Sequence, residues 1–303
     1  MDKPCHSEST IWSMNKVLEF IQAHLQESLT LEDISQVALL SKFHFHRIFK
    51  MVTSESLTQF IQRLRIEKAA NMIYIEPCAN LTDIAMQCGF SSSGYFSRIF
   101  KAHYGISASA FRQLPLHDKQ QFIQTHIKGL ASLKSFPQLE EKLDVGIERI
   151  PAMNLAYIRK YYFNLQDEPG IIYRMFDFIT AWGQQKGLMG EDTRVLGIIH
   201  DNPYLTPYSK YQYDACITVK SPILEEGIVG TKTLLEGTYA VLKLRGVSKE
   251  ILERSIYTFL TSWLISSGYS MDNRPILEFY YGPPIGGNFS MDFCAPVHNK
   301  NQK

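Results

Sequence analysis

The sequence predicts two domains: an all-α double helix-turn-helix domain, then an α+β domain made of two strand-helix-strand repeats. Three observations predict this fold class. The chain has 303 residues and is 45% hydrophobic, which exceeds the roughly 100–200 residues of one domain. Helical periodicity before about residue 115 gives way to short β-branched and aromatic runs after residue 145. Each region also contains an internal repeat. We place the domains at 1–115 and 144–303, with a partly helical linker at 116–143 between them.

The composition excludes several classes of protein. Charged residues make up 20% of the chain, aromatic residues 12%, and the net charge is +1, which argues against disorder and against a basic nucleic-acid tail. Because we find neither a long apolar run nor a secretory signal, we expect a cytoplasmic protein without a membrane segment. The sequence also lacks phosphate loops, paired metal-binding histidines and nucleophile elbows, so we expect no cofactor, no metal and no catalytic residue.

The first element is a helix whose apolar residues recur at steps of three and four. Its buried face is predicted to carry Ile11, Met14, Leu18, Ile21 and Leu25. A duplicated unit follows this helix. Leu31–Leu40 aligns with Leu81–Phe90, and Phe43–Gln62 aligns with Gly94–Gln113.

Each copy of the duplicated unit predicts a helix-turn-helix. Thr30 or Asn80 can cap the first helix, and Ser41 or Ser91 opens the second. Gly89 suits a tight turn between the two helices of the second copy.

The second helix of each unit has an apolar face and a polar face. Phe45, Ile48 and Phe49 point toward the core, as do their counterparts in the second unit, and the basic residues point outward. Arginine can bind guanine edges, and a helix fits the major groove, so both helices are predicted to read DNA. The alternative is an ordinary solvated helix face. Duplication of the whole unit favours DNA recognition.

A long helix over Leu57–Tyr74 is predicted to join the two units and to hold both reading helices against one side of a duplex. Residues 1–115 contain eleven Lys or Arg against ten Asp or Glu, so overall electrostatic steering is weak. Affinity should therefore depend on local contacts to phosphates, which we assign to Lys50, Arg63, Arg65 and Lys101.

Several motifs within Val17–Gln113 resemble the AraC/XylS family of transcription regulators. They are Arg65–Ala70 in the joining helix, Asp83-Ile84-Ala85 before the second turn, and Gly89–Lys101 after it. The resemblance implies two helix-turn-helix units joined by a helix. It also implies that bases are contacted by Phe43, His46, Arg47, Ser92, Ser93, Ser97 and Arg98.

The C-terminal region is predicted to repeat a strand, a helix and further strands. Strand patterns cover Ala152–Arg159, Asp214–Lys220, Thr238–Leu244 and Pro275–Tyr281, and helical stretches cover Ile171–Lys186 and Lys249–Ser266. Leu196–Pro203 echoes Leu277–Pro284, and Asp214–Val219 echoes Asp292–Val297. Two such halves can pair their sheets and leave a groove for a small molecule.

Asp144–Val297 resembles the gyrase-inhibitor-like effector-binding domain, and the order of the two domains resembles that of Rob-type regulators. The motifs that carry this resemblance are Asp201-Asn202-Pro203, Thr206-Pro207, Tyr211–Cys216 and Leu277–Tyr280. Relatives of this module bind amphipathic or cationic compounds, and some isolated members hydrolyse small molecules.

Glu278 interrupts an apolar strand at the position where the first half has Gly197. A carboxylate in an apolar groove costs several kcal/mol unless it is paired, protonated or awaiting a cation. The alternative is an outward-facing residue on a solvated strand face. Aromatic residues, which otherwise belong to the core, can line such a groove. We therefore predict an effector site made of Glu278, Tyr280, Trp182, Tyr213, Tyr239 and Trp263.

These observations favour a transcription regulator that binds double-stranded DNA and senses a small amphipathic molecule, with cationic compounds as the favoured candidates. RNA polymerase is a further expected partner, and the oligomeric state stays open. Two alternatives remain. One is a DNA-binding domain fused to a hydrolase that uses Glu278 as its base. The other is an architectural DNA-binding protein whose second domain supports dimerisation.

Overall fold

The computed structural model describes residues 8–75, 78–115, 118–119, 122, 142–161, 170–200, 212–272, 274–283 and 285–300. The chain divides into two compact units, which are treated separately below. Most of the predicted linker at 116–143 lies outside the described residues, as do Asp201–Pro203, Thr206-Pro207 and Tyr211. In the described part of the chain, no helix is both long enough and apolar enough to span a membrane.

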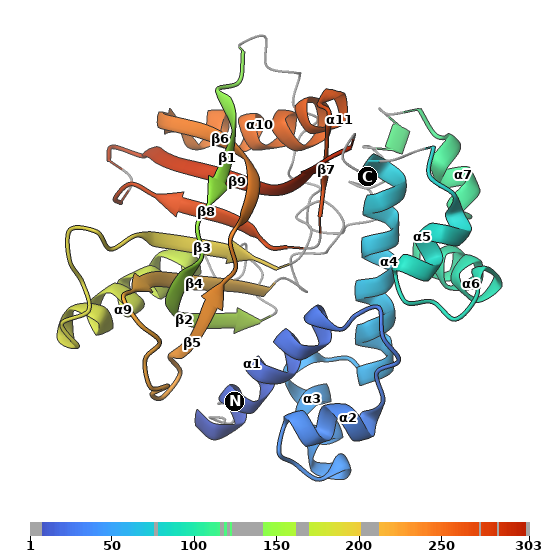
Figure 1. Cartoon of the computed structure of the whole chain (residues 1–303), viewed down its shortest axis with the longest axis horizontal. Coiled ribbons are helices and arrows are strands. Elements are labelled where there is room, and N and C mark those ends of the chain that lie inside the picture. Colours follow the sequence, from blue (N-terminus) through green and yellow to red (C-terminus); the bar gives the residue numbers. More distant parts are fainter. Residues whose placement is uncertain are drawn as a thin grey trace. The chain divides into compact units, whose positions relative to one another are not determined.

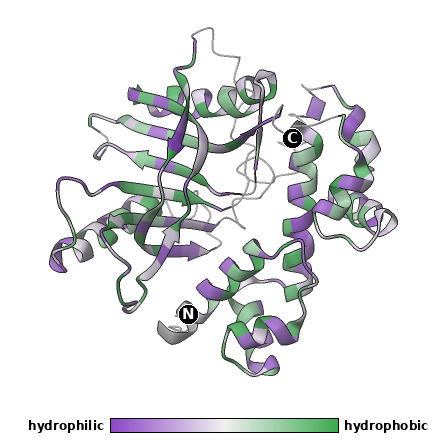
Figure 2. Ribbon diagram, viewed as in Figure 1, coloured by the Kyte–Doolittle hydropathy of each residue, from purple (hydrophilic) through white to green (hydrophobic). Residues whose placement is uncertain are grey.

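The N-terminal unit is entirely helical, as the sequence predicted (Figure 1). Its helices are α1 (Glu8–Ala23), α2 (Leu31–Val37), α3 (Lys42–Thr53), α4 (Leu57–Ile75), α5 (Leu81–Gln87), α6 (Ser93–Tyr104) and α7 (Ala108–Gln113). The joining helix α4 contacts α3 on one side of the repeat and α5, α6 and α7 on the other. Polar and apolar residues alternate around these helices (Figure 2). Their apolar faces bury the phenylalanines Phe45, Phe49, Phe60, Phe96, Phe100 and Phe111.

Side-chain caps define where the helices of both helix-turn-helix units begin. Thr30 forms a capping box with Asp33 at α2, Asn80 caps α5, and Ser41 caps α3. At α6 the cap is Ser92 rather than the predicted Ser91, since the Ser92 hydroxyl accepts a hydrogen bond from Tyr95 N–H.

The turns of the two units use different residues at the same repeat position. Leu39 adopts φ 54° in the first unit and Gly89 adopts φ 82° in the second. Both values lie in the left-handed region of backbone conformation. Glycine adopts this conformation without a steric cost, whereas leucine adopts it only at a steric cost.

The C-terminal unit is an α+β domain, as predicted. Its strands are β1 (Val145–Ile150), β2 (Met153–Tyr161), β3 (Val195–Ile199), β4 (Gln212–Val219), β5 (Gly230–Leu234), β6 (Gly237–Ser248), β7 (Tyr269–Met271), β8 (Ile276–Tyr280) and β9 (Asn288–Asn299). The helices are α9 (Ile171–Gln185), α10 (Lys249–Thr258) and α11 (Leu264–Ser266), with a π-helical turn at Phe259–Trp263 between the last two.

The strand order is β1-β6-β9-β8-β3-β4-β2-β5, with β7 paired to β9. The two halves therefore occupy mirrored places in the sheet: β2, β4 and β3 correspond to β6, β9 and β8. The halves meet at the antiparallel β3–β8 pair, where Gly197 lies directly opposite Glu278. The edge strands exchange partners, because β1 pairs with β6 of the other half and β5 pairs with β2.

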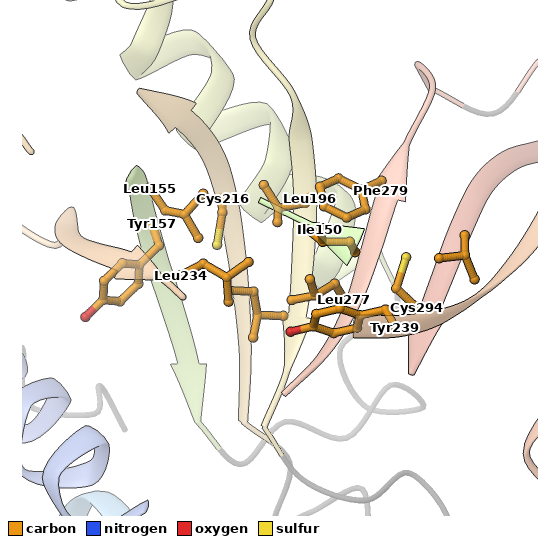
Figure 3. Close-up of a cluster of buried hydrophobic side chains, with 12 residues drawn as sticks. Ile150, Leu155, Tyr157, Leu196, Cys216, Leu234, Tyr239, Leu277, Phe279 and Cys294 are labelled. Atoms are coloured by element: carbon orange, nitrogen blue, oxygen red, sulfur yellow. The ribbon is translucent and has the colours of Figure 1, made fainter. Parts of the chain in front are cut away.

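The two faces of this sheet differ in their partners. One face holds a cluster of buried residues that includes Leu155, Leu196, Leu277 and Cys294 (Figure 3). The opposite face carries the helices: Phe176 of α9 meets Tyr213 and Tyr280, and Phe259 meets Phe293 of β9. Because side chains alternate along a strand, Glu278 lies on the helix-bearing face.

Candidate functional site

The helix α3 presents the polar side chains that the sequence assigned to DNA. His46, Arg47 and Lys50 are exposed, whereas Phe45, Ile48 and Phe49 are buried on the opposite side of the helix. Phe43, near the start of α3, is 82% exposed. These side chains are therefore available to a ligand.

The helix α6 presents an equivalent surface. Ser93, Ser97, Arg98 and Lys101 are all exposed, and the Arg98 guanidinium lies 5.5 Å from the centroid of the Tyr95 ring. The Ser97 hydroxyl donates to the Ser93 carbonyl at 2.8 Å. Arg47 and Arg98 occupy equal repeat positions, as do Lys50 and Lys101. Both reading helices therefore expose the same pair of cations.

The prediction that Arg63 contacts a phosphate is wrong. Its side chain is 6% exposed and forms ion pairs with Glu55 at 3.1 Å and with Glu67 at 3.4 Å. Arg63 lies one turn from Phe60 and one turn from Glu67 on the buried face of α4. Its guanidinium group is therefore paired inside the unit and is not available to a phosphate. Glu67 at i+4 is a sequence signal that could have indicated this pairing.

Arg65 also departs from its predicted role. It is half-buried, its Nε donates to the Leu25 carbonyl at 2.9 Å, and its Nη2 donates to the Glu27 carbonyl at 2.5 Å. These bonds attach the turn that follows α1 to α4. Two guanidinium donors thus bind backbone within the unit, and the assignment of Arg65 to a DNA phosphate loses support.

In the C-terminal unit, Glu278 accepts two hydrogen bonds from tyrosines. Tyr213 donates to its Oε2 at 2.7 Å, and Tyr280 donates to the same oxygen at 2.8 Å. Burial raises the pKa of Glu278, although both hydroxyls act in the opposite direction by stabilising the anion. The side chain is partly exposed on the helix-bearing face. This arrangement provides a partly desolvated carboxylate that lacks a cationic partner among these contacts.

Gly197 explains how Tyr213 reaches Glu278. A Cβ atom at position 197 would lie 1.9 Å from the Tyr213 hydroxyl oxygen, which is far inside contact distance. The missing side chain leaves space for the phenol, directly across the strand pair from the carboxylate. Gly197 and Glu278 therefore act together at the junction of the halves. The glycine leaves the space that Tyr213 needs to donate a hydrogen bond to the glutamate.

The structure adds Phe176 to this site. Its ring packs edge-on against Tyr280, with centroids 5.0 Å apart, and against Tyr213 at 6.2 Å. Burial raises the pKa of Tyr280 well above its ordinary value, and Tyr173, which lies one turn earlier on α9 and is 49% exposed, adds to this shift. Sequence reasoning missed both residues. Their spacing of three on an amphipathic helix was the available signal.

The assignment of Tyr239 to the effector site is wrong. Tyr239 is fully buried, belongs to the apolar cluster with Leu277 and Cys294 (Figure 3), and faces away from Glu278 across the sheet. Trp263 stacks on Phe259, which contacts Phe293, so it lies on the same side as Glu278. Trp182 is half-buried on α9. The roles of both tryptophans at the site stay predictions.

A separate buried ion cluster lies on the sheet face opposite Glu278. Asp214 accepts hydrogen bonds from Arg159 at 2.5 and 2.8 Å, lies 2.7 Å from His200 Nε2, and also binds Lys232. Burial lowers the pKa of His200 to about 4. These groups pair with one another and tie β2, β4 and β5 together. Within the described part of the chain, no group of His, Cys, Asp or Glu is suited to hold a metal ion.

A duplicated helix-turn-helix with exposed cations and a duplicated sheet with one central carboxylate define a class of two-domain proteins that join a DNA-reading module to a ligand-binding module. Comparisons with known proteins give the family. Residues 143–297 match the GyrI-like small molecule binding domain, and residues 34–114 match a helix-turn-helix domain. The chain belongs to the GyrI-like family, and its N-terminal domain is of the AraC type.

Curated relatives each match part of this chain. The uncharacterized HTH-type transcriptional regulator YbfP of Bacillus subtilis is 30% identical over 45% of this chain and 46% of its own length. The probable transcription factor PqrA of Proteus vulgaris is 32% identical over 33% of this chain and 83% of its own length. A solved structure of an EcmrR–DNA complex covers 89% of this chain and 99% of its own, with a TM-score of 0.44 and 14% identity. The chain thus spans about half the length of the first of these relatives.

Proposed function

We propose that this protein is a transcription regulator that reads DNA with α3 and α6 and binds an amphipathic cation beside Glu278. The observation that carries the DNA-binding part is the duplicated exposure of Arg47 with Lys50 and of Arg98 with Lys101. Such pairs suit a division of labour in which arginine binds base edges and lysine binds phosphates. The two units would then read successive major grooves on one side of a duplex.

The observation that carries the sensing part is the partly exposed carboxylate of Glu278 among aromatic rings. Tyr213, Tyr280 and Phe176 surround it on the helix-bearing face of the sheet. A desolvated carboxylate attracts a cation, and the rings add apolar area and cation–π contacts. Binding energy in this site should therefore depend on both the charge and the aromatic character of the ligand.

DNA binding is tested with the full chain and a duplex selected from a random-sequence pool. Lys50→Ala and Lys101→Ala should each weaken binding to selected and random duplexes alike, and each should reduce the slope of log K against log salt by about one. Thr82→Ala, an exposed change on α5, is the control. An unchanged salt slope in both lysine variants contradicts the proposed phosphate contacts.

Cation sensing is tested by calorimetric titration of the full chain with tetraphenylphosphonium and with tetraphenylborate, which share their shape and differ in charge. Wild type should prefer the cation, and Glu278→Gln should remove that preference. Tyr280→Ala should weaken binding of both ions through lost contact area. If Glu278→Gln binds the cation as tightly as wild type does, Glu278 is not the cation site.

The fused-hydrolase alternative predicts a different outcome from the same material. Glu278 would act as a base on water or substrate, so the chain would consume an electrophilic ester, and Glu278→Gln would lose that turnover. Binding of the cation without consumption of an ester favours sensing. RNA polymerase remains a proposed partner, to be tested by transcription from a promoter that carries the selected site.

A further inference from the structure

The N-terminal unit contains a hollow between its two helix-turn-helix units. Its volume is about 240 Å³, and residues of α3, α4 and the start of α6 line it. Its walls come from the loop before α2 and the start of α2, from α3, from the first three turns of α4, from the turn after α5 and from the start of α6. The lining includes His46, Leu57, Ile61, Arg65, Phe90 and Tyr95.

The hollow is positively charged on one side. Its lining includes the cation Arg65 but no Asp or Glu. Arg65 is half-buried, and its hydrogen-bond acceptors are the carbonyls of Leu25 and Glu27. Neither acceptor carries a formal charge, so the guanidinium charge has no anionic counterpart at the hollow. The described part of the chain gives Arg65 no ion pair, which leaves space for an anion from solution.

A second feature adds to this positive field. Leu57 and Thr58 begin the 19-residue helix α4, and Ser56 directly precedes it. The amino end of a helix carries partial positive charge. Tyr95 receives a hydrogen bond from Gln62, so polar groups of α4 and α6 meet at the same wall. The polar side of the hollow can therefore bind a carboxylate through both charge and hydrogen bonds.

The remaining wall is apolar. Leu29, Leu31, Leu57, Ile61 and Phe90 supply aliphatic and aromatic surface opposite the polar groups. The volume lies just below the range of about 300–1,000 Å³ that is usual for small-molecule sites. A ligand of one or two rings fits this size. Its chemistry would combine an apolar body with one anionic group.

We propose that this hollow is a second ligand site, which binds a small amphipathic carboxylate with its acid group toward Arg65 and its body against Leu57, Ile61 and Phe90. The site differs from the Glu278 site in the sign of the charge that it selects. It lies within the DNA-reading unit, so its occupant acts on DNA binding without a signal from the other unit.

The occupant contacts two residues of the DNA-reading surface. His46 lines the hollow and is also a proposed base contact on α3. Tyr95 lines it too, and its ring supports the Arg98 guanidinium. A carboxylate there also places negative charge next to the proposed path of the DNA phosphates. The acid and DNA should therefore oppose each other, with a coupling of roughly fivefold. This last step rests on the proposed function.

The test uses the full chain and two probes of one shape, 2-naphthoate and the neutral 2-naphthamide. Calorimetric titration should show binding of the acid at least about tenfold tighter than binding of the amide, because only the acid carries the charge that Arg65 attracts. Thr58→Trp should block the hollow and abolish binding of the acid. Ser109→Trp is the matched control, since it holds the corresponding exposed position of the second repeat, on α7, and does not line the hollow.

Two further variants separate the possible outcomes. Arg65→Gln should remove the preference for the acid, with circular dichroism to establish that the helices remain folded. Glu278→Gln should leave binding of the acid unchanged, because the two sites are independent. Equal binding of acid and amide, or full binding of the acid by Thr58→Trp, would overturn the proposal.

The effect of the acid on DNA binding is measured in a separate experiment. Addition of 2-naphthoate should weaken binding of the selected duplex in wild type and have no effect in Thr58→Trp. If 2-naphthoate binds with the predicted dependence on Arg65 and Thr58 but leaves DNA affinity unchanged, the ligand site stands and its link to DNA reading is wrong. If no duplex is bound at all, the proposed function fails while the titration still decides the ligand site.

Discussion

Both units of this protein contain a duplication, and the two duplications have been used differently. In the N-terminal unit the copies keep the same outward cations, Arg47 with Lys50 and Arg98 with Lys101, on two separate exposed helices. In the C-terminal unit the copies meet at one strand pair, and there Gly197 faces Glu278. Copies that act at separate places can stay alike, whereas copies that share one place cannot.

The physical reason lies in the space at the junction of the C-terminal halves. A second glutamate at position 197 would place two carboxylates side by side in a desolvated setting, which is strongly unfavourable. A side chain there would also displace Tyr213 from its hydrogen bond to Glu278. One copy therefore supplies the carboxylate and the other supplies the room for its hydrogen-bond donor.

The largest expected effect concerns the turn at which the two helix-turn-helix copies differ. Gly89→Leu should lower the free energy of unfolding of the N-terminal unit by about 3 kcal/mol or more, because a side chain at φ 82° is strained and its Cβ would lie 2.7 Å from the Leu25 carbonyl oxygen. Urea unfolding, with hydrogen exchange of α5 and α6, measures the loss. An unaltered midpoint would mean that the turn can relax.

The next effect tests whether α3 and α6 contribute equally to the free energy of binding to the selected duplex. Arg47→Ala and Arg98→Ala should each cost about 1–3 kcal/mol of binding to the selected duplex and leave affinity for random DNA largely intact. Competition titrations with both duplexes measure this difference. Equal losses on the two duplexes would assign these arginines to phosphates, and a loss in only one variant would make the copies functionally unequal.

The central carboxylate predicts a pH-dependent stability. The pKa of Glu278 is raised in the folded state, so the folded chain binds this proton more tightly than the unfolded chain does. The carboxyl thus opposes folding at neutral pH, and this cost disappears as the pH falls below the ordinary value of 4.5. Glu278→Gln should raise the unfolding temperature at pH 7 and give little change near pH 4.5. A pH-independent difference would contradict this account.

The smallest expected effect is a gain in stability. Leu39 holds the same turn position as Gly89, at φ 54°, with its side chain 82% exposed. Leu39→Gly should stabilise the N-terminal unit by about 0.5–1 kcal/mol, since relief of backbone strain exceeds the entropy cost of glycine. Leu39→Ala keeps the strained φ and is the control. A loss of stability in Leu39→Gly would show that the leucine makes contacts that outweigh the strain.

Much of this fold could be predicted from the sequence, because local patterns determine it. The helical periodicity, the capping residues and the repeat of Arg47 and Arg98 define the helix-turn-helix units before any tertiary contact is considered. The alternation around Glu278 and its contrast with Gly197 likewise indicated an unusual carboxylate. In the folded chain, burial raises the pKa of Glu278, and Gly197 lies directly opposite it in the strand pair.

Only the tertiary structure decided which polar and aromatic side chains are available. Arg63 and Lys50 read alike in sequence, yet Glu55 and Glu67 draw Arg63 inward while Lys50 stays exposed. Tyr239 and Tyr213 both belong to strands, but the register of the sheet puts them on opposite faces. Sequence periodicity predicts which side chains of a helix or strand share one face, because that depends on local geometry. The partner of that face depends on contacts between residues far apart in the chain, which local geometry does not contain.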